Sequence, residues 1–104
     1  RYRTDFRRDL EEQFDWLGRH APGRAIRSLD DALIELRSLL ATYPRAGAIE
    51  RRENGDIVYR IVLHRLPYLV WYQIEEDQSA RTVWLIRLFH ARQDRGGGGA
   101  DNAP

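Results

Sequence analysis

Cysteine and lysine are both missing from this chain, and each absence removes a class of chemistry. Without cysteine there is no disulfide framework, no thiolate metal site and no cysteine nucleophile, which fits a protein of the reducing cytoplasm. Without lysine there is no Walker A motif, no Schiff-base enzyme and no lysine general acid. All 17 basic residues are arginine. Any cationic site must therefore be built from guanidinium groups, which stay charged and hold phosphate or carboxylate through two parallel hydrogen bonds.

Long apolar runs and metal-binding patterns are also missing. No stretch approaches the roughly 18–20 apolar residues that a membrane helix needs, and there is no signal peptide with a charged start and an apolar centre. The three histidines do not stand at metal-binding spacing, so we expect neither a metal nor another cofactor. With 104 residues and a net charge of +1, we expect one cytoplasmic domain that does not associate with a membrane.

The first part of the chain predicts an amphipathic helix over residues 5–19. Its apolar residues recur at intervals of three and four, which is one stripe of a helix: Phe6, Leu10, Phe14 and Leu17. Thr4 or Asp5 could cap its start, and Gly18 lies at its expected end.

A second apolar stripe predicts a second helix, which forms a helical hairpin with the first. Its members are Ile26, Leu29, Leu33, Leu36 and Leu40. Pro22 suits the first turn of this helix, and Pro44 helps to stop it. Neither stripe is wide enough to fold alone, so we expect both helices to lie on a sheet.

Three to four antiparallel strands are predicted in the second half, over residues 57–64, 68–74 and 82–89, with a weaker signal over 48–52. Asn54-Gly55 predicts a tight hairpin between residues 48–52 and 57–64, because both Asn and Gly tolerate positive φ. Aromatic and β-branched side chains dominate the last two strands. Two helices followed by an antiparallel meander is an α+β arrangement, with both helices on one sheet face and the other face partly open.

The domain is expected to span residues 2–95. Residues 96–104 include four consecutive glycines and predict a flexible tail, because such a segment cannot bury enough surface to order itself.

Arg60, Arg87 and His90 interrupt the apolar pattern of the strands. Charged groups in a buried strand cost free energy unless they are paired or used. Arg60 and Arg87 could hold a phosphate and stabilise developing charge, and His90 could move a proton near neutral pH. Equally, His90 could bond a backbone carbonyl, and each arginine could pair with a nearby acid, the candidates being Glu50, Glu75 and Glu76.

Other basic and aromatic side chains leave two interpretations open. Four arginines could contact an acidic antitoxin or target, or form a solvated surface: Arg51, Arg52, Arg92 and Arg95. Trp71, Tyr72 and Trp84 could stack on nucleic-acid bases, although aromatics in alternating strands more often belong to the core.

An ordered set of segments resembles the RelE/ParE superfamily of bacterial toxins from type II toxin–antitoxin modules. The segments are Asp9–Leu17, Leu39–Gly47, Tyr59–Arg60, Pro67–Tyr72 and Leu88–Asp94. The resemblance implies an N-terminal helical hairpin packed on a small antiparallel sheet. Family members usually begin with a short strand before the first helix. Only Arg1-Tyr2-Arg3 precede it here, so that strand is expected to be short, cut away or replaced by a partner.

The superfamily contains two activity classes, and the resemblance favours one of them. RelE-like members cut messenger RNA on the ribosome with Lys and Arg and a late Tyr or His, whereas ParE-like members poison DNA gyrase. Arg60, Arg87 and His90 stand at places that match the ribonuclease positions, but there is no lysine and no tyrosine after Arg87. The ending His90–Asp94 is more similar to the ParE branch.

The resemblance therefore implies a gyrase-inhibiting toxin that does not act as an enzyme. A cognate antitoxin would neutralise it within a hetero-oligomer by wrapping a partly disordered segment around it. Two alternatives stay open. One is a metal-independent endoribonuclease acting on mRNA, free or on the ribosome, and the other is a non-toxic relic that still binds its antitoxin.

Overall fold

The computed structural model describes residues 1–21, 23–63 and 65–91, and these residues form two helices followed by four strands. The elements are α1 (Thr4–His20), α2 (Gly23–Thr42), β1 (Ala48–Glu53), β2 (Asp56–Val62), β3 (Tyr68–Glu76) and β4 (Arg81–His90). The strands pair antiparallel in the order β1-β2-β3-β4. The predicted α+β meander is therefore confirmed. The predictions for Pro22, for His64 and for residues 96–104 lie outside the described residues.

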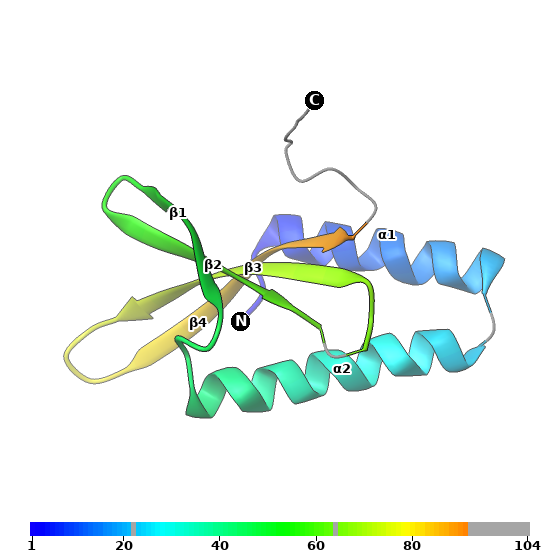
Figure 1. Ribbon diagram of the computed structural model, residues 1–104, viewed down its shortest axis with the longest axis horizontal. Helices are drawn as coiled ribbons and strands as arrows, with labels where there is room; N and C mark the ends of the chain where they lie inside the picture. The colour runs from blue at the N-terminus through cyan, green and yellow to red at the C-terminus, as the bar shows by residue number, and fades with distance from the viewer. Residues whose placement is uncertain (22, 64, 92–104) are drawn as a thin grey trace.

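The two apolar stripes of the helices meet one face of the sheet in a single core. Figure 1 shows the helices running alongside each other, with the β1–β2 and β3–β4 turns at the opposite end of the molecule from the α1–α2 connection. The buried side chains of this core include Phe6, Leu17, Leu29, Leu33, Leu36 and Leu40 from the helices, and Tyr59, Tyr68, Val70, Tyr72, Leu85 and Leu88 from the strands. Below, the sheet face in this core is called the inner face and the opposite one the open face.

The ends of α1 differ from the prediction. Arg3 occupies the N-cap position and its side chain makes no capping hydrogen bond, so neither Thr4 nor Asp5 is the cap. The helix also continues through Gly18 to His20. Glycine lowers the stability of a helix by about 1 kcal/mol relative to alanine, and Leu17, directly before it, is packed in the core.

The Asn54-Gly55 hairpin between β1 and β2 is as predicted. Asn54 has φ 54° and Gly55 has φ 85°, which are the positive angles of a two-residue type I′ turn. This turn sets the register of the hairpin, in which Arg52 lies opposite Ile57.

A β-bulge in β4 interrupts the simple alternation of side chains. Trp71 pairs with Arg87 while Tyr72 pairs with Leu85, so Ile86 is an extra residue on β4. Leu85 and Leu88 consequently both reach the inner core, and Ile86 packs on the open face. This explains how a strand with an arginine in its middle buries leucines on both sides of it.

The residues before α1 form a rudimentary parallel strand beside β4. Tyr2 forms a single bridge with Leu85. The Arg3 N–H donates to the Leu85 carbonyl at 2.9 Å, and the Leu85 N–H donates to the Arg1 carbonyl at 2.8 Å. The expected N-terminal strand is thus present in its short form, and the chain itself covers this part of the β4 edge.

Candidate functional site

Arg60, Trp71 and Arg87 form a cross-strand row on the open face. Trp71 of β3 lies opposite Arg60 of β2 on one side and opposite Arg87 of β4 on the other. Neighbouring strands are about 4.8 Å apart, so the two arginine backbones are roughly 10 Å apart. Two of the residues expected to bear function therefore share one face.

Both arginines of this row are paired with carboxylates. The Arg60 Nε lies 3.2 Å from Glu50 Oε1, and the two side chains are 47% and 33% exposed. Glu50 was one of the partners that the sequence offered. A guanidinium that is paired and half exposed can still meet solvent, but its charge is largely compensated by its neighbour.

Arg87 forms a stronger contact, with Asp9 of α1. Its Nε and one terminal nitrogen donate to the two Asp9 carboxylate oxygens at 2.7 and 3.2 Å, and the Leu88 N–H also donates to that carboxylate at 2.9 Å. The hydrogen bonds and charge of Asp9 raise the pKa of the Arg87 guanidinium. The Asp9 side chain is only 12% exposed. Sequence reasoning missed Asp9 as this partner, although an acid beside the apolar stripe of α1 was a signal.

His90 does not join the two arginines. Its ring contacts the Tyr68 ring edge-on, with 5.2 Å between centroids, and Tyr68 belongs to the inner core. Arg87 instead lies over the ring of Phe89, a residue of the open-face cluster. Side chains three apart in a regular strand point to opposite faces, so the sequence spacing alone could have shown this separation.

Arginine side chains cover an apolar cluster on the open face. Val58, Leu69 and Trp71 are buried there without any helix residue in the cluster, and Ile86 and Phe89 pack against them. The Arg51 guanidinium lies 4.8 Å from the centroid of the Trp71 ring. An arginine can cover apolar surface in this way with its methylene groups while its charge stays in solvent.

The remaining predicted binding residues are scattered. Arg52 is exposed on β1, while Arg92 and Arg95 lie outside the described residues. Trp71 and Tyr72 are core residues. Trp84 is partly buried, donates its indole N–H to Glu75 at 3.0 Å and carries Arg3 over its ring at 4.1 Å. Base stacking is therefore open to none of the three without rearrangement of these contacts.

A hollow lies on the open face beside Trp71 and Arg87 of the cross-strand row. It has a volume of about 450 Å³ and is lined by Arg3, Thr4, Asp5, Arg51, Trp71, Ile86 and Arg87. The Trp71 Nε1 is the only buried side-chain nitrogen or oxygen without a hydrogen-bond partner in the described part of the chain. Within that same part, no cluster of three or more His, Cys, Asp or Glu side chains is suited to a metal ion.

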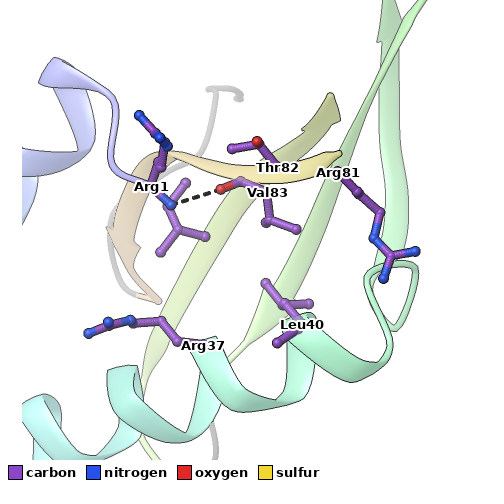
Figure 2. A pocket seen from close by; sticks show the side chains of 8 residues that line it. Arg1, Arg37, Leu40, Arg81, Thr82 and Val83 are labelled. Carbon is purple, nitrogen blue, oxygen red and sulfur yellow. Dashed lines mark hydrogen bonds between the residues drawn. The ribbon is translucent and has the colours of Figure 1, made fainter. Parts of the chain in front are cut away.

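A second cavity is a cleft between α2 and β4. It measures about 580 Å³ and is lined by Arg1, Arg37, Leu40, Ala41, Arg81, Thr82, Val83 and Leu85. Figure 2 shows Leu40 and Val83 extending toward each other from the two walls, with the Arg37 and Arg81 guanidiniums at opposite ends. We call it the α2–β4 cleft. No sequence pattern predicts this cleft, because its walls are far apart along the chain.

Comparison with known proteins decides the family. A protein-family model described as the ParE toxin of the type II toxin–antitoxin system, parDE, matches residues 1–95. The chain belongs to the ParE toxin family. No curated protein matches the chain in sequence.

Membership of the ParE toxin family agrees with the architecture and gives the coarse function. The chain is a toxin of a type II toxin–antitoxin system, and the family implies a cognate antitoxin as its partner. The ParE branch was also the one that the lack of lysine favoured. In the described residues, no helix is both long enough and apolar enough to cross a membrane.

Proposed function

We propose that this ParE-family toxin acts in the cytoplasm by binding and inhibiting DNA gyrase, and that its cognate antitoxin neutralises it in a hetero-oligomer. The observation that carries the proposal is the family match, which extends over residues 1–95. Inhibition by binding needs a surface of the right shape and charge but no catalytic residues. Cleavage of RNA needs groups that hold the phosphate and move protons at the same place.

The arrangement of the polar residues supports inhibition over RNA cleavage. Arg60 and Arg87 are paired with Glu50 and Asp9, and an anionic substrate would have to compete with those carboxylates. His90 contacts Tyr68 on the inner face, away from both arginines. A proton donor on the other side of the sheet cannot reach a phosphate held by the arginine row.

The proposal is tested by a supercoiling assay with toxin freed from its antitoxin by denaturation and refolding. Purified gyrase and relaxed plasmid are incubated with toxin from equimolar to micromolar excess. We expect supercoiling to fall with toxin concentration and to recover when antitoxin is added. Full supercoiling at micromolar excess of folded toxin would overturn the proposal.

Pulse labelling in cells separates the alternatives. Toxin is induced without antitoxin, and incorporation of labelled thymidine and labelled amino acids is followed separately. We expect DNA synthesis to stop first. If protein synthesis stops first, the toxin is a ribonuclease of the RelE type. If neither changes while the protein is folded, it is a relic.

A further inference from the structure

We propose that the α2–β4 cleft binds an acidic, amphipathic segment of the cognate antitoxin, with an apolar side chain between Leu40 and Val83 and acidic side chains at Arg37 and Arg81. This inference depends on the proposed function only because both name the antitoxin as the partner. The antitoxin is the partner that family membership implies, whereas gyrase is itself a proposal.

The cleft carries arginines whose guanidiniums form no ion pair among the described residues; Glu76, which lies opposite Arg81 in the sheet, is paired with Arg45 instead. Arg37 and Arg81 make no ion pair with any residue that the structure describes, in contrast to Arg60 and Arg87 of the open-face row. Arg1 adds a third guanidinium to the lining, and carboxylates gathered among unpaired guanidiniums form charge-assisted, two-pronged hydrogen bonds. The cleft therefore selects a negatively charged ligand.

The centre of the cleft is apolar. Leu40 from α2 and Val83 from β4 face each other between the charged ends (Figure 2), and Leu85 also belongs to the lining. A highly charged ligand such as a free phosphate would leave this apolar centre in contact with water. A protein segment with an apolar residue between two acids satisfies both parts of the surface.

The binding surface extends beyond the cleft around the end of α2. Arg81 also lines a neighbouring hollow of about 510 Å³ with Leu39, Thr42, Tyr43, Pro44, Arg45 and Ala46. Leu39 is 39% exposed and Tyr43 is 64% exposed. An open groove with exposed apolar side chains along its course suits a continuous polypeptide better than a small molecule.

Charge reversal tests the inference on the full chain. The probe is the full-length, fluorescently labelled cognate antitoxin, and its affinity is measured by anisotropy. The test variant is Arg37→Glu with Arg81→Glu. The control is Arg24→Glu with Arg27→Glu, which changes the net charge equally at exposed positions of the same helix. We expect the cleft variant to lose at least tenfold in affinity and the control less than twofold.

Two further measurements separate binding from folding. Arg37→Gln with Arg81→Gln removes the charges without reversing them and is expected to give a smaller loss in the same direction, with an unchanged melting temperature. Raising the salt concentration should reduce the difference between wild type and the cleft variant, because exposed charges are screened. Equal affinities for the cleft and control variants, in folded proteins, would overturn the inference.

The outcome is independent of the gyrase assay on the wild-type toxin. If the wild type leaves gyrase active but the antitoxin needs Arg37 and Arg81, the proposed function fails and the cleft assignment holds. If the wild type inhibits gyrase but the cleft variant binds antitoxin normally, only the cleft assignment fails.

Discussion

At the scale of single residues, Asp9 is a partly buried acid on which three hydrogen bonds from β4 converge. It joins α1 to the edge of the sheet, because one carboxylate accepts the Arg87 guanidinium and the Leu88 backbone N–H together. Arg87 was predicted as a catalytic candidate, but these contacts also give it a structural role. The catalytic role stays a prediction that belongs only to the ribonuclease alternative.

Replacing Asp9 with alanine is expected to lower the free energy of unfolding by about 2–3 kcal/mol. The change leaves a partly buried guanidinium and a backbone N–H without their acceptor, and hydrogen bonds to charged groups contribute about 1.5–3 kcal/mol. The control is Asp15→Ala, which removes an exposed pair with Arg19 and should cost less than about 0.5 kcal/mol. Urea unfolding measures both; equal costs would show that Asp9 has no special role.

Because Tyr68 and Tyr72 are buried, we predict that the folded protein loses stability at alkaline pH. Burial raises the pKa of Tyr68, and burial is also the largest cause of the raised pKa of Tyr72. In the unfolded chain a tyrosine ionises near pH 10. Between that pH and the higher folded value the unfolded state binds fewer protons, so stability falls as the pH rises. The stabilising contribution of these two tyrosines is fully present below about pH 10.

Urea unfolding between pH 8 and pH 11 tests this expectation. The free energy of unfolding should stay level to about pH 10 and then fall by at most about 1.4 kcal/mol per pH unit for each tyrosine. Tyr68→Phe should fall less steeply than the wild type, whereas Tyr43→Phe, at an exposed position, should follow the wild type. An unchanged slope in Tyr68→Phe would contradict the prediction.

At the scale of elements, one glycine lets the end of the helical hairpin meet the sheet. The Gly47 N–H donates to the Tyr72 hydroxyl oxygen at 2.9 Å. A Cβ at this position would lie 2.5 Å from the Arg60 carbonyl oxygen and 2.9 Å from the Tyr72 hydroxyl oxygen. Both distances are shorter than van der Waals contact, so β1 can approach β2 and β3 here only without a side chain.

Two Gly→Ala changes should therefore act in opposite directions. Gly47→Ala is expected to cost about 2–3 kcal/mol, because it forces backbone apart in a packed region and disturbs the bond to Tyr72. Gly18→Ala should stabilise the protein by about 0.5–1 kcal/mol, since its Cβ meets nothing within 4 Å inside α1. Thermal melts of both variants measure this; a shift of the same sign in both would refute it.

The sequence predicted these elements well where a local pattern determines them. The apolar stripes of both helices and the Asn54-Gly55 turn are local signals, and all three are found in the structure. The bulge at Ile86 could not be predicted, because it depends on how β4 fits against β3 and α1. The N-cap was missed for a similar reason, since Arg3 is fixed by its bond to Leu85 rather than by its own side chain.

The candidate site was predictable only in part. Alternation along β2 and β3 places Arg60 and Trp71 on one face. Glu50 lies at a register shift between Ile49 and Arg51 of β1, so its pairing with Arg60 depends on an irregularity that the turn alone does not predict. Asp9 and Arg87 are at opposite ends of the described chain, and only the packing of α1 along β4 brings them together. Arg37 and Arg81 are also far apart along the chain, and only the placement of α2 beside β4 brings them to one cleft.

At the scale of the whole molecule, the sheet separates two different surfaces. Its inner face is covered by two helices, and its open face by arginine side chains over a small apolar cluster. Arg60 and Arg87 belong to the open face and His90 to the inner face. A mechanism that requires all three at one phosphate therefore requires the sheet itself to rearrange.

This separation predicts that the activity of the toxin survives loss of the supposed catalytic groups. We expect Arg60→Gln with His90→Phe to stop thymidine incorporation as fast as the wild type, within about twofold. Phenylalanine keeps the ring contact with Tyr68 while it removes the titratable group, and glutamine keeps the length and polarity of the side chain near Glu50. Urea unfolding checks that the variant is folded. A ribonuclease that used either group would instead lose about 10²-fold or more in rate, and the folded variant would then no longer arrest growth.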